Sequence, residues 1–560
     1  MKTSRLSRLL SFLFVLPFML GTAMAGEVDK QIDQALGPIA KGIEKVVFFG
    51  FEVQGNFLPI VLVVLGGTAI FLTIYFKFIN LTSIGLAMRT VKGKYTSPDA
   101  PGQITHFQAL TAALSATVGL GNIAGVAVAV GIGGPGATFW MILMGLCGMT
   151  TKFCECTLGV KFRQIDSEGR VRGGAMYYLS RGLGEKGLGP LGMGLAICFA
   201  IMCIGGAIGA GNMFQVNQAA TQVSDSFGVF TESKLMFGVI LAIIVGMVII
   251  GGIVSIARVT SLLVPFMCGM YLIAALIIIV TNIDHVGNAF SQIVTGAFSP
   301  IAFGGGMVGV LIQGIKRAAF SNEAGIGSAP IAHSAVKTEK PASEGIVALL
   351  EPFTDTVVVC TMTALVLIIT GTWKVDGVAK EDQVALYAAA SIEEPAVKNL
   401  EKGAEMRILK KTDDGKFGEV WQEDGPSLWV DMEQVTAISG VVKTSRAFGQ
   451  QLKWFPKLLA IAVLLFAFST MISWSYYGEQ AVLFLCGGYN PAAVIFYKVM
   501  FCAFVVVGSV ASMDNVVIIS DSLIFAMVLP NLIGVYLLLP VVKKELVNFR
   551  QHAAEIDAKK

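Results

Sequence analysis

Two glycine-broken polar stretches interrupt long apolar segments of this 560-residue chain, and their residue types suit the binding of an ion or a small polar ligand. The first reads Ser115-Ala-Thr-Val-Gly-Leu-Gly-Asn-Ile-Ala-Gly125, and the second reads Ser321-Asn-Glu-Ala-Gly-Ile-Gly-Ser-Ala-Pro330. In lipid, irregular backbone is tolerated only inside protein or beside a cavity, because every peptide group needs a hydrogen-bond partner. Two such breaks predict a secondary transporter whose ligands bind where helices unwind.

The stretch around Gly119 and Gly121 has the chemistry to bind both ends of a zwitterion. Unwound backbone offers amide N–H groups, at the positive end of the following half-helix, to a carboxylate, and it offers carbonyl oxygens to a cation. Thr117 and Asn122 add polar side chains. The alternative is close helix packing through small residues. The G-x-G-x-x-x-G spacing, with no soluble strand before it, disfavours a nucleotide site.

The second break adds a charge, because Glu323 lies beside Asn322 in the middle of an apolar span. A lone carboxylate at this depth is costly, so such a residue is usually paired, hydrated or near a cation. Lys316 and Arg317, about two turns upstream, are candidate partners. The functional alternative is that Glu323 shapes an ion or amine subsite.

Hydroxyl groups recur in a later apolar segment, which reads Phe468-Ser-Thr-Met-Ile-Ser-Trp474. The hydroxyl oxygens of Ser469 and Thr470, together with helix carbonyls, are hard donors that suit Na+. The alternative is that these hydroxyls bond back to the preceding helical turn.

Amide and charged side chains recur in other apolar segments. Spacings of three, three and four residues put four amides on one helix face, where they either bond neighbouring helices or line a polar cavity: Asn212, Gln215, Gln218 and Gln222. Lys152 and Glu155 are three residues apart and predict a structural ion pair or an inner gate. Glu351 and Asp355 are further candidate network charges with no obvious partner in the sequence.

Composition places the chain among integral membrane proteins. It is 54% hydrophobic and 14% charged, with a mean hydropathy of +0.72, against about 25% charged residues in soluble domains. A net charge of +3 and the lack of a basic patch interleaved with aromatics exclude a nucleic-acid partner. Its four histidines are scattered without catalytic or metal-ligand spacing, which disfavours an enzyme: His106, His285, His333 and His552.

The apolar segments predict an all-α polytopic membrane protein with about eleven transmembrane helices. The predicted spans are 56–79, 105–134, 136–160, 188–223, 235–256, 262–282, 302–335, 345–371, 453–475, 492–512 and 515–540. The fourth span has room for a further break at Gly205–Gly211. The bundle thus divides into a first part, 56–371, and a last part, 453–540.

The N-terminus has the pattern of a secretory signal. Basic residues precede a short apolar run, Leu9 to Leu20, and Ala23-Met24-Ala25 follows it, so we expect a signal peptide at 1–25 and an outer segment at 26–55. The alternative is an uncleaved first membrane helix. Lys and Arg follow the first, third, fifth, seventh and last spans, which predicts an outer N-terminus, a cytoplasmic tail at 541–560 and residence in the cytoplasmic (inner) membrane.

One hydrophilic insert, residues 372–452, falls on the predicted outer face. Asp413-Asp-Gly415, flanked by Arg407-Ile-Leu and Phe417-Gly-Glu-Val-Trp421, predicts a hairpin turn with a short strand on each side. The insert has three alternative roles: a lid over the entrance, a partner-docking surface or a neutral insertion. The last is an alternative because surface loops tolerate added length.

Several motifs together resemble the alanine or glycine:cation symporter family. They are Val118-Gly-Leu-Gly-Asn122, Gly173-Gly-Ala-Met-Tyr177, Gln313-Gly-Ile-Lys-Arg317, Phe320-Ser-Asn-Glu-Ala-Gly-Ile-Gly-Ser-Ala-Pro330, and Ser469-Thr470 with Trp474. The resemblance covers residues 56–540, and the Phe320–Pro330 string is its most specific part. The 372–452 insert is longer than the family pattern leads us to expect.

The resemblance implies a LeuT-type architecture: a 5+5 inverted repeat formed by spans two to six and seven to eleven, plus one extra N-terminal helix. Both breaks then fall in the first helix of a repeat. It also implies a Na+ site at the carbonyls near Ser115 and Val118 with the hydroxyls of Ser469 and Thr470, and a second ion at Thr117 and Asn122.

The implied substrate site lies against both breaks, the amide face and Trp474, whose bulk favours substrates with small side chains. Its residues are Thr117, Gly119, Gly121, Gln215, Phe320, Ser321, Asn322, Gly325, Gly327 and Trp474. A gating or charge network would comprise Lys152, Glu155, Lys316, Arg317 and Glu323.

The leading hypothesis is a sodium-coupled symporter that imports a small neutral amino acid, alanine or glycine, by alternating access. It needs the lipid bilayer and Na+ but no organic cofactor. One alternative is proton coupling through Glu323 in the same fold, and another is an amino-acid sensor that does not transport. Oligomeric state has no signature in the sequence.

Overall fold

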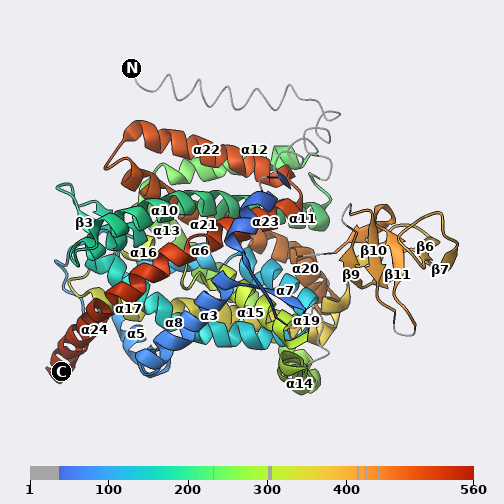
Figure 1. The fold of residues 1–560 in the computed structure, drawn as a ribbon, viewed down its shortest axis with the longest axis horizontal. Helices are drawn as coiled ribbons and strands as arrows, with labels where there is room; N and C mark the ends of the chain where they lie inside the picture. Colours follow the sequence, from blue (N-terminus) through green and yellow to red (C-terminus); the bar gives the residue numbers. More distant parts are fainter. Residues whose placement is uncertain are drawn as a thin grey trace.

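A computed structural model describes residues 37–559, apart from positions 39, 54, 231–232, 300–305, 413–414, 423–424 and 439. The predicted signal at 1–25 lies outside the described residues. Helices dominate (Figure 1), and those of the first part are α3 (Ile60–Tyr75), α4 (Ile79–Thr82), α5 (Ile84–Val91), α6 (His106–Thr117), η1 (Gly121–Gly125), α7 (Val126–Gly133), α8 (Gly136–Lys161), α9 (Ala175–Tyr177), η2 (Tyr178–Gly182), α10 (Gly189–Ile208), η3 (Gly209–Met213), α11 (Phe214–Phe227), α12 (Lys234–Ile249), α13 (Gly252–Thr281) and α14 (Ile283–Phe298).

The second half of the chain is also mainly helical and contains one large insert. Its helices are α15 (Gly306–Asn322), α16 (Pro330–His333), α17 (Pro341–Ala348), α18 (Leu350–Pro352), η4 (Phe353–Cys360), α19 (Thr361–Thr370), η5 (Thr372–Lys374), η6 (Met432–Gln434), α20 (Gly440–Gln451), α21 (Phe455–Leu485), α22 (Pro491–Val510), α23 (Met513–Phe525) and α24 (Val528–Ala558). The predicted tail at 541–560 is largely a helical continuation of α24.

The insert folds into a small β domain with its own apolar core. A five-stranded sheet has the order β7-β6-β11-β10-β9, and a three-stranded sheet has the order β12-β5-β8. Leu386, Val420 and Val430 are buried between them. The strands are β5 (Gly377–Ala379), β6 (Val384–Tyr387), β7 (Ala396–Leu400), β8 (Glu405–Met406), β9 (Ile408–Lys411), β10 (Phe417–Val420), β11 (Leu428–Asp431) and β12 (Val435–Ala437).

The predicted hairpin in this domain is confirmed. Strands β9 and β10 pair antiparallel, with Lys411 opposite Gly418, on either side of the predicted turn. Gly415 has φ +71°, a left-handed conformation that glycine adopts without steric cost. Two further hairpins lie outside the domain: β1 (Gly50–Val53) with β2 (Asn56–Pro59), and β3 (Gln164–Ile165) with β4 (Val171–Arg172).

Seven helices of the described residues are long and apolar enough to cross a membrane, or eight if the bent pair α6 and η1–α7 forms one span. The other three predicted spans correspond to α3 and α12, of 16 residues each, and α15, of 17 residues. The count of eleven therefore stays a prediction. The predicted start of the first span at 56 is wrong, because residues 56–59 form β2 and extended Pro59 precedes the helix.

The predicted break in the fourth span is present as the π-helical turn η3. A methyl group at Gly211 would lie 2.3 Å from Trp474 Cβ, so the wider turn and its glycine let α21 approach closely.

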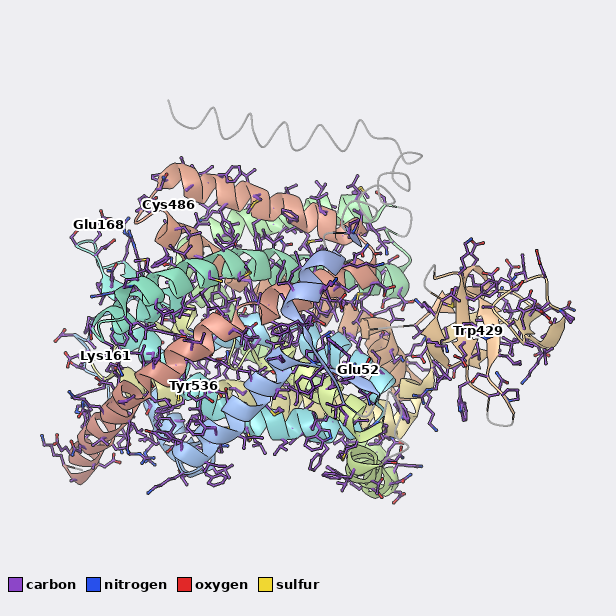
Figure 2. All side chains as sticks on the ribbon, in the orientation of Figure 1. Glu52, Lys161, Glu168, Trp429, Cys486 and Tyr536 are labelled. Carbon is purple, nitrogen blue, oxygen red and sulfur yellow. The ribbon has the colours of Figure 1, made fainter. Side chains whose placement is uncertain are left out.

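The β domain and the C-terminus lie at opposite ends of the bundle (Figure 1). Trp429 marks the first end, whereas Lys161 and Glu168 lie at the second (Figure 2). Lys443 of α20 binds Asp376 of the domain at 2.5 Å, and the Arg407 guanidinium lies 4.8 Å from the Trp373 ring centre. These contacts attach the domain to the bundle beside α7.

Candidate functional site

The first break separates α6 from η1 and bends the chain by 50°. A capping box between Thr105 and Gln108 starts α6, and extended Val118 (φ −74°, ψ 92°) ends it. The Gly119 N–H donates to Asn122 Oδ1 at 2.8 Å, and the Leu120 N–H donates to Gln215 Oε1 at 3.4 Å. The two amide groups at the break are therefore directed at side-chain oxygens rather than at a helical turn.

The first break requires glycine, because atoms of neighbouring residues approach its backbone closely. A methyl group at Gly119 would lie 2.6 Å from Thr470 Oγ1 and 3.3 Å from Gln215 Oε1. One at Gly121 would lie 3.5 Å from Ser321 Cα and 3.6 Å from the Phe320 ring. The first break thus faces α21 and the second break together, as the predicted substrate site requires.

The second break follows α15 and has a left-handed backbone at three positions. Glu323, Gly325 and Gly327 have φ of +56°, +88° and +86°. A side chain at Gly325 would lie 2.3 Å from Leu65 Cδ1, and one at Gly327 would lie 2.7 Å from Asn531 Cγ. Glycine therefore satisfies both the backbone conformation and the packing.

Asn122, Ser321 and Asp355 join the two breaks to η4. Asn122 Nδ2 donates to Asp355 Oδ2 and Ser321 Oγ donates to Asp355 Oδ1, each at 2.7 Å. Thr356 Oγ1 also donates to Asp355, at 2.7 Å. Asp355 is fully buried, and these three donors are neutral. Asn322 joins this cluster through Thr356, because its Nδ2 donates to Thr356 Oγ1 at 2.9 Å.

Hydroxyl and carbonyl oxygens converge where α6 meets α21. Thr470 Oγ1 donates to Ser115 O at 2.9 Å, and Ser115 Oγ donates to Ser469 O at 2.7 Å. Ser473 Oγ, which our sequence analysis did not single out, donates to Ser115 Oγ at 3.0 Å. The Ser469 hydroxyl bonds back to Phe466 O at 3.0 Å. The structure therefore brings Ser115, Ser469 and Thr470 together as predicted.

Thr117 and Val118 occupy the last turn of α6. The Thr117 hydroxyl bonds back to Ala113 O at 3.3 Å, so the structure does not bring it together with the Asn122 side chain. Val118 is fully buried at the end of the helix.

Glu323 does not pair with Lys316 or Arg317, and that expectation is wrong. Its carboxylate instead accepts from Trp474 Nε1 at 3.1 Å and from the Ser328 hydroxyl. The left-handed turn at Glu323 reverses the chain after α15, which carries its side chain away from the preceding two turns.

Lys316 and Arg317 both bind Asp521, which links α15 to α23. Lys316 Nζ lies 2.8 Å from Asp521 Oδ2, and the Arg317 guanidinium contacts the same oxygen. Arg317 also lies over the Phe320 ring at 5.3 Å, and Phe320 packs edge-on against Phe214 at 5.2 Å. This group of charged and aromatic side chains covers one side of the two breaks.

Lys152 and Glu155 do not form the predicted ion pair with each other. Lys152 Nζ binds Glu351 Oε1 at 2.9 Å, so Glu351 does have a partner. Glu155 accepts from Asn531, whose Nδ2 also donates to Gly325 O at 2.8 Å. The two residues share a face of α8 but reach different neighbours, α18 in one case and α24 in the other.

Sequence reasoning missed a cluster of buried acids and histidines. Glu344 Oε1 lies 2.5 Å from His333 Nδ1, and Glu344 Oε2 contacts His106 Nδ1. His333 Nε2 lies 3.4 Å from Glu351 Oε2. His106 and His333 are far apart in the sequence, so their spacing carried no signal. The only hint was an acid within an apolar segment, as at Glu323.

The amide stripe of α10–α11 mainly bonds neighbouring helices. Asn212 Nδ2 donates to Phe501 O at 2.7 Å, and Gln222 Nε2 donates to Ser445 Oγ at 2.9 Å. Gln218 Oε1 accepts from Val441 N at 3.2 Å. Gln215 differs, because its oxygen faces the first break.

Comparison with known proteins identifies the family of this chain. The model described as the sodium:alanine symporter family matches residues 46–396 and 427–560. The chain belongs to that family. A sodium/alanine symporter, AgcS, of Methanococcus maripaludis is 37% identical over 494 residues, covering 88% of this chain and 94% of that protein. The amino-acid carrier protein AlsT of Bacillus subtilis is 30% identical, covering 86% and 87%.

A solved structure, MhsT in complex with L-phenylalanine, aligns with 79% of this chain and 99% of that chain, at 14% identity and a TM-score of 0.46. Family membership shows a multi-pass membrane transporter, a cation-coupled amino-acid symporter and not an enzyme. The family match omits residues 397–426, which contribute most of β7 and all of β8, β9 and β10 of the β domain.

Proposed function

We propose that this protein couples the uptake of a small neutral amino acid, alanine or glycine, to Na+ by alternating access. The observation that carries the proposal is the close approach at Gly119, where the first break, Thr470 and Gln215 meet. A zwitterion needs hydrogen-bond donors for its carboxylate and acceptors for its amine, and unwound helix ends offer both. The sodium/alanine symporter AgcS and the sodium:alanine symporter family support alanine as substrate and Na+ as the coupled ion.

The proposed Na+ site lies between α6 and α21. Its ligands are the carbonyl oxygens of Ser115 and Val118 with Thr470 Oγ1 and Ser469, and the position of Ser473 adds a fifth candidate oxygen. In this site Na+ replaces direct bonds between the two helices, so ion binding fixes the shape of the first break. The substrate binds that same break, so each ligand raises the affinity for the other.

A second cationic group is proposed beside Asn122 and Asp355. Among the residues that the structure describes, only neutral groups donate to this buried carboxylate, and burying an ionised group is costly without an opposite charge. Either a second Na+ or the ammonium group of the substrate supplies that charge. Thr117 contributes through its backbone in this proposal, because its hydroxyl bonds within α6.

The proposed substrate site uses the N–H groups of Gly119 and Leu120 for the carboxylate, in place of the Asn122 and Gln215 oxygens they now face. Buried Trp474 limits the size of the substrate side chain. The remaining lining comes from both breaks and their neighbours: Thr117, Gly121, Phe320, Ser321, Asn322, Gly325 and Gly327.

The proposed topology places the β domain outside and the C-terminus in the cytoplasm, in the inner membrane. Basic residues at the C-terminal end support it through the positive-inside rule, Lys161 among them (Figure 2). In a 5+5 inverted repeat, α6–α13 form the first unit and α15–α24 the second. Lys316 and Arg317 with Asp521 then close the outer side of the two breaks.

Alanine uptake into proteoliposomes tests the proposal, with an inward Na+ gradient or with K+ in its place. We expect accumulation with Na+ alone, and Thr470→Ala should weaken both uptake and Na+ dependence. Ser475→Ala is the matched control, because the Ser475 hydroxyl bonds back to Ile472 O at 2.8 Å on the same helix. Uptake that persists in K+ and follows a pH gradient would support proton coupling through Glu323 instead. Binding without uptake would support a sensor.

A further inference from the structure

The two broken helices are joined at the end of the bundle that carries the C-terminus. Residues 101–104, which lead into α6, run beside residues 335–338, which follow α16. Four backbone bonds join them: Gln103 N to Ala335 O at 2.8 Å, Ile104 N to Ala335 O at 3.2 Å, Lys337 N to Ile104 O at 2.8 Å and Thr338 N to Pro101 O at 3.2 Å. We call this pairing and the side chains that hold it the inner latch.

Arg163, just beyond α8, clamps both segments of the inner latch. Its Nη1 donates to Ser334 O at 2.7 Å and to Val336 O at 2.5 Å. Its Nη2 donates to Pro101 O and to Thr338 O, each at 2.8 Å. Burial lowers the Arg163 pKa to about 10, so the guanidinium stays charged at neutral pH. The single Arg163 guanidinium thus binds carbonyl groups from both segments of the inner latch.

Glu344 of α17 joins the two half-helices a second time. One carboxylate oxygen faces His106, the first residue of α6, and the other faces His333, the last residue of α16. All three side chains are buried. Bonds from an imidazole N–H to an ionised carboxylate are roughly twice as strong as bonds between neutral groups. A single acid therefore bridges two elements that belong to different broken helices.

The same cluster continues toward the second break. His333 faces Glu351 at 3.4 Å, and Glu351 binds Lys152 of α8 at 2.9 Å. Glu155, on the same helix, is linked through Asn531 to the Gly325 carbonyl. Side-chain bonds on either side of α8 therefore connect the inner latch, through that helix, to the region where the substrate is proposed to bind.

We propose that Glu344 is a positioning residue that holds the inner latch closed by binding His106 and His333 at once. This proposal rests on the alternating access of the proposed function. A path to the C-terminal side opens only if α6 and α16 separate, and separation breaks at least one of the two Glu344 bonds. The strength of these bonds therefore sets the ratio of inward-closed to inward-open protein.

A labelling experiment tests this role directly. Ser334→Cys places a reporter in the latch, where the native side chain is fully buried. A membrane-impermeant maleimide is added to vesicles that expose the C-terminal side, and peptide mass spectrometry gives the rate at position 334. In this background we expect Glu344→Gln to raise the rate by about tenfold or more, the size expected for loss of a hydrogen bond to a charged group.

Glu545→Gln is the matched control, because Glu545 binds Lys161 at 2.7 Å at the same end of the bundle but outside the latch. Its labelling rate should stay within about twofold of the reporter protein, by the usual size of effects at partly exposed ion pairs. An equal rate for Glu344→Gln and Glu545→Gln would overturn the proposal. Labelling needs no substrate, so a failure to transport alanine would leave this result interpretable.

Two variants of His106 test the same proposal independently, in case Glu344→Gln fails to fold. His106→Ala removes the bond to Glu344, whereas His106→Asn keeps a side-chain N–H near the position of Nδ1. We expect fast labelling in the alanine variant and a rate close to that of the reporter protein in the asparagine variant. Equal rates in the two variants, at equal melting temperature, would contradict a positioning role.

Discussion

Gly119→Ala tests the proposed ion site, because the first break has no room for a methyl group. The added Cβ would lie 2.6 Å from Thr470 Oγ1 and 3.3 Å from Gln215 Oε1. The first distance is far below a normal carbon–oxygen contact, so Thr470 must move. Its bond to Ser115 O, 2.9 Å long, lies at the centre of the proposed Na+ ligands and would be lost.

The size of the effect follows from two contributions. Overpacking a well-packed site costs about 1–3 kcal/mol. Displacement of Thr470 Oγ1 from the proposed Na+ ligands adds about 1 kcal/mol, the usual size for one lost neutral hydrogen bond. The two contributions sum to about 2–4 kcal/mol, and about 1.4 kcal/mol changes an equilibrium constant tenfold, so we expect the Na+ concentration for half-maximal alanine uptake to rise about 30- to 700-fold.

Gly125→Ala is the control within the same polar stretch. In the described part of the chain, no atom outside its own helix lies within 4 Å of a methyl group at Gly125, and its backbone (φ −62°, ψ −39°) is right-handed helical. Uptake in proteoliposomes, measured across Na+ concentrations, should match the parent for this variant. The shift of melting temperature with Na+ reports binding independently of transport. If Gly119→Ala had the Na+ dependence of Gly125→Ala in both assays, the proposed site would be refuted.

Two further predictions concern packing and buried polar groups. Gly345→Ala places a methyl group 2.0 Å from Thr157 Oγ1, so α17 must move off α8 and the melting temperature in detergent should fall sharply. Gly269→Ala, with no atom within 4 Å, should melt like the parent, and equal melting of the two would contradict the packing. Asn531→Leu removes the donor to the buried Glu155 carboxylate and should cost about 1–3 kcal/mol, measured by thermal unfolding. An unchanged melting temperature would show that Glu155 finds another donor.

The helix breaks were predictable because glycine and polar residues are unusual in apolar spans. Gly119, Gly325 and Gly327 stand at positions where the fold leaves no room for a side chain or requires a left-handed backbone. The hairpin between β9 and β10 was readable for a similar reason, since its turn signal is local in the sequence.

Charge partners were not predictable, because they depend on which helices meet. Helical spacing suggested that Lys316 lies near Glu323, but the turn at Glu323 sends its side chain to Trp474. Lys316 instead meets Asp521, more than 200 residues away. The His106 and Glu344 contact is equally distant. Periodicity identifies the face on which a residue lies, and only packing identifies what covers that face.

The β domain also matters for experiments on this protein. Most of the chain is helical bundle, which detergent or lipid would cover and which offers few features to align in electron microscopy. The domain has its own core, projects from one end (Figure 1) and is anchored by the ion pair between Asp376 and Lys443. A nanobody raised against its outer strands would give particle images a fixed marker of orientation, set at the end of the bundle opposite the inner latch.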